Sequence, residues 1–144
     1  MLFRSDVVTV GSQASVTGSR VDAIRGLVTV NGQGGTDTLN VDDSGAVAAS
    51  VGALSASDVT GLGMTAGIGY AGIESLSIGL GSGADAFTIQ GTAALAATTL
   101  TTNDGDDRVV VRGTGGATTI RTNAGNDAVD VLATSAAKIG RAHV

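Results

Sequence analysis

Aspartate residues at regular spacing are the side chains of this chain best suited to chemistry. Asp85, Asp107 and Asp127 are separated by 22 and 20 residues, so each holds the same place in an internal repeat. Asp104 and Asp106 make the middle turn the most acidic. Close carboxylates repel one another, and Ca²⁺, which prefers several oxygen ligands, would relieve that repulsion. These five aspartates are therefore a candidate Ca²⁺ site, but hydrogen bonding to nearby backbone is the favoured interpretation of the repeated aspartates.

The repeat around these aspartates reads Gly-x-Asp-x-apolar-x-apolar. Its copies occupy residues 35–41, 83–89, 105–111 and 125–131, and Asp6 starts a fifth copy that lacks the glycine. The glycine permits a positive φ, and the aspartate can close a turn. The two apolar positions then point to one face of a strand. The residues expected to form the turns are Gly35, Asp37, Gly83, Gly105, Asn103, Asn123 and Gly125.

Stacking of the copies predicts which side chains form columns. The four aspartates of the complete copies, including Asp37, are expected to line one edge, with Asn103 and Asn123 forming an amide ladder beside them. Stacked strands also predict a narrow aliphatic core. Its expected members are Val109, Val111, Val129, Val131, Leu100 and Ile120, with Arg108, Val110 and Arg112 facing outward.

These patterns predict an all-β chain folded as a parallel β-solenoid of about 20–22-residue coils. Residues 6–137 are expected to form a single repeat domain. The spacing of 48 residues between Asp37 and Asp85 exceeds one coil, so residues 46–72 are interpreted as an irregular insertion. Segments 1–5 and 138–144 resemble translated sequencing-library adapters, and we expect both to be non-native.

Composition excludes several classes of function. The chain has 144 residues with 23 Gly, no Pro, no Cys and one Tyr, which suits a thin core of small side chains. The absence of Cys removes disulfides and thiolate metal sites. Thirteen acids against eight Lys and Arg, with no basic run or stacking aromatics, argue against nucleic-acid binding. No apolar stretch has the length of a transmembrane helix.

The Gly-x-Asp-x-apolar-x pattern resembles the hemolysin-type calcium-binding repeats (RTX repeats) of secreted bacterial proteins. In that family, Gly-rich turns bind Ca²⁺ between successive coils of a β-roll, and the motif recurs about every nine residues. Here the motif comes once per coil, and the opposite turn at 112–116 contains no acid. The resemblance implies a structural repeat region of a bacterial surface or secreted protein, with adjacent repeats as its partners.

Three functions remain open at this point. The chain is expected to be a spacer, stalk or adhesion-associated segment, with a Ca²⁺-dependent folding module as the first alternative. A carbohydrate-active β-helix is the second, but the predicted outward columns are mostly Thr, Ala, Gln and Asn, without converging acids and bases. We therefore expect no enzymatic activity and identify no catalytic residues.

Overall fold

The computed structural model describes residues 4–13, 18–132 and 139–143, and these residues form strands and turns only. No helix in this part of the chain is long and apolar enough to cross a membrane. The strands are β1 (Val7–Val10), β2 (Val28–Asn31), β3 (Thr38–Asp42), β4 (Val51–Leu54), β5 (Asp58–Gly61), β6 (Ile68–Ala71), β7 (Ser75–Gly79), β8 (Ala86–Ile89), β9 (Ala97–Thr101), β10 (Arg108–Val111), β11 (Thr118–Arg121), β12 (Ala128–Val131) and β13 (Ile139–His143).

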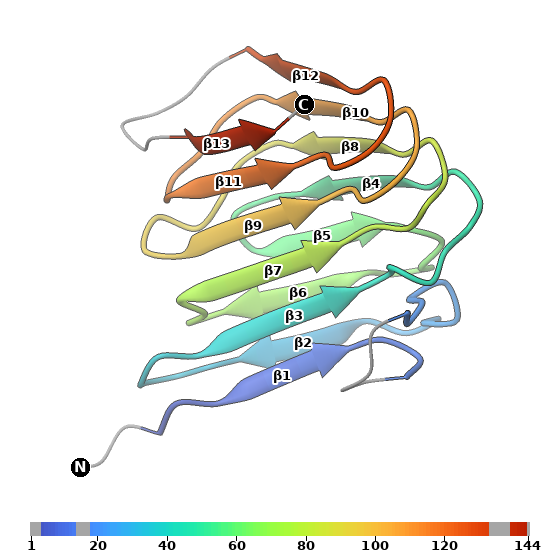
Figure 1. Cartoon of the computed structure of the whole chain (residues 1–144). Coiled ribbons are helices and arrows are strands. Elements are labelled where there is room, and N and C mark those ends of the chain that lie inside the picture. Colours follow the sequence, from blue (N-terminus) through green and yellow to red (C-terminus); the bar gives the residue numbers. More distant parts are fainter. Residues whose placement is uncertain (1–3, 14–17, 133–138, 144) are drawn as a thin grey trace.

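The strands are arranged in two mostly parallel sheets (Figure 1). Sheet A has the order β1-β3-β7-β9-β11-β13, and all its pairs are parallel. Sheet B has the order β12-β10-β8-β4-β5-β6-β2, in which only β5 runs against its neighbours. From β7 onward the chain alternates between the sheets, with one strand in each. A turn at the edge of the structure connects each strand to the next one in the opposite sheet.

The predicted alignment of equivalent side chains is confirmed. In sheet B, Val109 aligns with both Phe87 and Val129. In sheet A, Leu100 aligns with both Ile78 and Ile120. Side chains alternate between the two faces of a strand, so each aligned set faces the interior as a column. The alternation of apolar and polar residues along each strand therefore predicted the register between neighbouring strands.

The core lies between the two sheets, and it matches the prediction except at its C-terminal end. Val109, Val111, Leu100 and Ile120 are fully buried. Arg108 and Arg112 are exposed, whereas Val110 is half-buried. The prediction was wrong for Val131, which is 49% exposed, and incomplete for Val129, which is only partly buried. Both lie on β12, the last strand of sheet B, and no further strand among the described residues pairs with it.

Residues 46–72 contribute three strands to sheet B. They contain β4, β5 and β6, which form an antiparallel meander between β8 and β2. The hydroxyl of the buried Tyr70 on β6 donates a hydrogen bond of 2.7 Å to the carbonyl of Ser55. The segment expected to be irregular is thus part of the sheet.

Candidate functional site

The repeated acids lie on two edges of the structure, not on one. Asp6 and Asp37 precede β1 and β3, which belong to sheet A. Asp85, Asp107 and Asp127 precede β8, β10 and β12, which belong to sheet B and run the opposite way (Figure 1). The prediction of a single column was therefore wrong. We call the first set, with Glu74 before β7, the first acidic edge, and the second set the second acidic edge.

On the second acidic edge each carboxylate binds the backbone of the preceding strand start. The N–H of Ser50 donates to Oδ1 of Asp85 at 2.7 Å, and the N–H of Asp85 donates to Oδ1 of Asp107 at 2.8 Å. The N–H of Asp107 donates to Oδ1 of Asp127 at 3.0 Å. Asp85 and Asp107 are each only 2% exposed, so these charge-assisted bonds lie in a desolvated setting. The acids thus connect neighbouring strand starts of sheet B.

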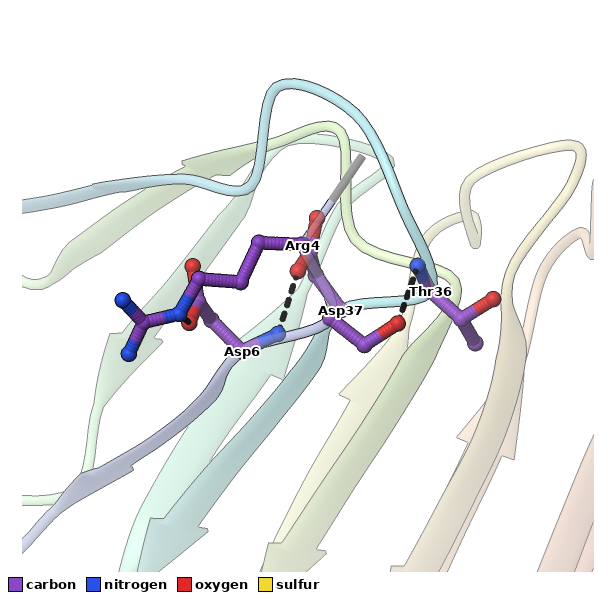
Figure 2. Close-up of polar contacts among 5 residues, drawn as sticks. Arg4, Asp6, Thr36 and Asp37 are labelled. Carbon is purple, nitrogen blue, oxygen red and sulfur yellow. Dashed lines mark hydrogen bonds and ion pairs between the residues drawn. The ribbon is translucent and has the colours of Figure 1, made fainter. Parts of the chain in front are cut away.

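The first acidic edge repeats the arrangement, with the Asp6–Asp37 bond drawn in Figure 2 and a glutamate in place of the next aspartate. The N–H of Asp6 donates to Oδ1 of Asp37 at 2.7 Å, and the N–H of Asp37 donates to Oε2 of Glu74 at 2.8 Å. Glu74 therefore accepts the hydrogen bond that an aspartate accepts elsewhere in the repeat. Arg4 forms an exposed ion pair with the Asp6 carboxylate at 2.8 Å, on the side where no earlier described strand start donates to it.

The sequence interpretation treated Glu74 as a solvated residue or a cap and did not place it in the repeat, because the repeat was defined by aspartate. The signal was present, since Gly72 stands two residues before Glu74, and Leu76 and Ile78 follow at the two apolar positions. Asp43, directly after β3, was missed as well. It accepts the N–H of Val21 at 3.0 Å, again from an earlier part of the chain. Side-chain acceptors are therefore more widely distributed than the Gly-x-Asp motif.

The glycines of the motif are required mainly by the close approach of an earlier segment of backbone. A Cβ on Gly125 would lie 1.8 Å from the carbonyl oxygen of Gly105, and one on Gly105 would lie 2.2 Å from that of Gly83. Gly35, Gly105 and Gly125 have positive φ, as predicted. Gly83 does not, yet its Cβ would lie 2.4 Å from the backbone of Ala48. Close contact with an earlier segment of backbone is therefore the feature common to all four.

Asn103 and Asn123 combine two roles. Both have positive φ, near 65° and 60°, a conformation that Asn tolerates better than most residues. The Asn123 side-chain amide donates to Oδ1 of Asn103 at 3.2 Å, and that of Asn103 donates to the carbonyl of Leu80 at 2.6 Å. The amides therefore link successive turns beside the second acidic edge.

Asp104 and Asp106 differ from their buried neighbour Asp107. Both are exposed. Oδ1 of Asp106 accepts the N–H of Asn126 at 2.9 Å. Here the earlier residue supplies the carboxylate and the later residue the N–H, which is the reverse of the contacts made by Asp85, Asp107 and Asp127. Asp104 forms a backbone bridge with Ala124. The most acidic turn is thus split into one inward and two outward carboxylates.

Burial governs the electrostatics of Asp85 on the second acidic edge. It raises the pKa of Asp85 above the ordinary value of 3.8, and the neighbouring Asp107 charge acts in the same direction. The backbone N–H groups of Ser50 and Gly81 lower the pKa but do not offset burial. Loss of water around the carboxylate is therefore stronger than the hydrogen bonds that replace it.

The donor set of these turns does not fit Ca²⁺. This ion takes six to eight oxygens, yet within the described ranges no three acidic, His or Cys side chains come together as a metal-binding group. One oxygen of each of Asp85, Asp107 and Asp127 already accepts a backbone N–H. The second oxygens of Asp107 and Asp127 are buried without a described partner. The geometry favours binding of backbone over binding of metal.

The arginines of the outer faces lie away from the acidic edges. Arg108 on β10 contacts Asp130 on β12 at 2.6 Å, the diagonal pairing that the register predicts, and both side chains are substantially exposed. Such a pair contributes little to stability. Arg112 and Arg121 are also exposed. The arginines and the buried acids therefore do not form a shared site.

The chain matches no protein-family model, no curated protein and no solved structure. Its role is therefore inferred from the geometry of its own residues.

Proposed function

We propose that this chain is a structural repeat region: a spacer, stalk or adhesion-associated segment of a bacterial surface or secreted protein. Its fold would be a parallel β-solenoid with coils of about 20–22 residues, extended by the strands of residues 46–72. In repeat architectures each unit contacts only its neighbours, and stability is a sum of such contacts. Adjacent repeats would be its natural partners.

One observation carries this proposal: the repeated acids bind the backbone of the neighbouring coil. Asp85, Asp107 and Asp127 each accept an N–H from one strand start earlier in the chain. A catalytic or ligand-binding carboxylate has to present free oxygens to solvent or to a cleft. Here the repeated aspartates hold neighbouring coils together. A spacer or stalk that resists force or sets a length needs this kind of contact.

The bacterial and extracellular assignment has a separate support. It rests on the resemblance of Gly-x-Asp-x-apolar-x to RTX repeats. The lack of Cys is compatible with either side of a membrane, because stacked repeats do not depend on disulfides.

The proposal is tested by adding coils and measuring length. Copies of residues 108–127, which span the 20-residue distance from one acid to the next, are inserted between Asp127 and Ala128. Spin labels are attached to cysteines introduced at the exposed Thr29 and Ala128, on β2 and β12, since the chain has no other Cys. Each copy should increase the distance between the labels by about 4.8 Å, the spacing of paired strands.

A scrambled insert of identical composition is the matched control. It should broaden the distance distribution without a regular increment, because the residues that stack and cap are out of place. If the native copies also fail to lengthen the chain in equal steps, they do not form stacked coils, and the spacer proposal fails.

A further inference from the structure

One side of β12 is a sheet edge without a strand partner. β12 ends sheet B, and among the described residues it pairs only with β10 (Figure 1). The N–H groups of Ala128 and Leu132 donate to backbone carbonyls at the two ends of β10, both at 2.8 Å. Backbone groups alternate in direction along a strand, so the N–H groups of Val129 and Val131 point away from β10. The free edge of β12 therefore presents a row of backbone donors and acceptors.

The sequence of β12 does not protect this edge. Natural sheets block exposed edges with Pro, Lys or a β-bulge. β12 reads Ala-Val-Asp-Val, and its pairing with β10 is regular over all four residues. Its core-facing side chains are open as well, since Val129 is only partly buried and Val131 is 49% exposed. The edge is therefore suited to pairing with a further strand.

The polar contacts of the second acidic edge define what such a strand must contain. Each strand start donates its N–H to the acid before the next strand of sheet B: Ser50 to Asp85, Asp85 to Asp107, and Asp107 to Asp127. No strand of the described chain follows β12 in sheet B, so no acid stands in the equivalent position beside the N–H of Asp127. An acid at the start of an added strand would continue the series.

Backbone contact and core packing add two further requirements. A Cβ on Gly125 would lie 1.8 Å from the carbonyl oxygen of Gly105. An added strand would cross the carbonyl of Gly125 in the same way, so it needs glycine two residues before its acid. Apolar side chains two and four residues after the acid would align with Val129 and Val131 and remove them from water, as the register between β10 and β12 shows.

We propose that the free edge of β12 binds, in parallel, an unpaired strand of the same repeat, recognised by the order Gly-x-Asp-x-apolar-x-apolar. This inference rests on the proposed function, because it names a repeat strand as the partner. A folded second copy does not supply such a strand among its described residues. Its strands β3, β8 and β10 follow complete motifs but are paired on both sides, and its β12 has only the same open edge.

The test uses the whole chain, isotopically labelled, and a blocked peptide of residues 103–112 as the probe, since this segment contains one complete motif. On binding, hydrogen exchange should slow at the amides of Val129 and Val131, which point to the free side. It should change little at Ala128, whose N–H is already bonded. A spin label at the amino end of the peptide should broaden the resonance of Asp127 more than that of Val131, because the pairing is parallel. Unchanged exchange at Val129 and Val131 overturns the proposal.

Peptide variants separate recognition of the motif from general strand pairing. Asp107→Ala in the peptide removes the acceptor for the Asp127 N–H and should weaken binding at least about tenfold, as expected for a charge-assisted hydrogen bond. Gly105→Ala places a Cβ against the carbonyl of Gly125 and should abolish measurable binding. Asp104→Ala makes the same change of charge at a position that is exposed in the protein, and this matched control should bind like the parent. Equal binding of the Asp107→Ala peptide overturns the proposal.

A variant of the protein tests whether the peptide pairs with β12. Val129→Pro removes one N–H on the free side and keeps the bonds to β10, so it should fold and lose the peptide. If it does not fold, Val131→Lys serves instead, because it places a charge at an exposed position where a peptide valine would pack. Retained binding in the variant that folds overturns the proposal.

Two other results distinguish the alternatives. Protection of Val129 and Val131 that rises with protein concentration in the absence of peptide would assign the edge to a second copy and overturn the proposal. The insertion experiment reports separately on the proposed function. Regular lengthening without peptide binding overturns only this inference, whereas peptide binding without regular lengthening overturns only the spacer proposal.

Discussion

The backbone N–H of Asp107 donates a hydrogen bond to the carboxylate of Asp127, 20 residues later in the sequence and one strand away in sheet B. The same relation links Asp85 to Asp107, Asp6 to Asp37 and Asp37 to Glu74. In all these pairs the later acid accepts from the earlier strand start. The acids are therefore spaced to hold neighbouring strands together, and their removal should lower the free energy of unfolding.

Replacing Asp107 tests this cohesion directly. Asp107→Ala leaves the buried N–H of Asp85 without its acceptor, which should lower the free energy of unfolding by about 1–3 kcal/mol. Asp107→Asn retains an oxygen at that place and should cost less. Denaturant unfolding measures both. Asp104→Ala changes an exposed acid in the same turn and should stay within about 0.5 kcal/mol of the parent. Similar losses for the two alanine variants would contradict a special role for the inward carboxylate.

Identical substitutions at two aligned valines should have opposite outcomes. Val111→Asp places an unpaired charge in the fully buried core and should abolish folding. Val131→Asp lies at the aligned position on β12, where the side chain is 49% exposed, and should fold. Circular dichroism and the dispersion of amide resonances report the result. A folded Val111→Asp protein would mean that the core register is different.

Stability should depend on the ionisation of Asp85. Because its pKa is raised in the folded state, the native protein binds more protons than the unfolded chain between pH 3.8 and that raised value. The contribution of Asp85 to the free energy of unfolding is therefore complete below pH 3.8, and it is lost as the pH rises through the folded-state pKa. Asp85→Asn mimics the protonated form, so its stability relative to the parent should increase from acidic to neutral pH. Thermal melts of both proteins across this range give the difference, and a trend in the other direction would mean that the Ser50 and Gly81 bonds outweigh burial.

Removal of calcium should leave the protein unchanged. Ligand binding to the native state would raise the melting midpoint according to concentration over Kd. Since the described acids do not gather into a metal-binding group, melts in EDTA and in millimolar CaCl₂ should coincide. Asp106→Asn, which alters the most acidic turn, should respond no differently. A melting midpoint that rises with CaCl₂ in the parent and not in the variant would mean that calcium binds at this turn.

The strand register was predictable because it depends on local chemistry. Alternation of apolar residues after each aspartate is enough to place Val109 and Val111 inward, and equal spacing is enough to align them with Val129 and Val131. The exposure of Val131 was not predictable in this way, because it depends on which strand ends the sheet.

The division of the acids between two edges could not be read from their spacing. Asp37 and Asp85 have the same motif, but four strands, β4 to β7, separate the strands that follow them. Three of these strands lie in sheet B, so counting whole coils across residues 46–72 gives the wrong edge. The direction of the hydrogen bonds could not be predicted either, because a sequence does not show which neighbouring strand a carboxylate faces.

The meander of residues 46–72 makes the two sides of the structure unequal in length. From β1 to β11, sheet A advances by four strand spacings, whereas sheet B advances by six from β2 to β12. At about 4.8 Å for each spacing, the path along sheet B is longer by about 10 Å. A stack with one long side would turn toward its short side, so an insertion of this kind predicts a bend with sheet A on the inside. In a longer array, insertions of this kind would act as elbows that set the direction in which the distal end points.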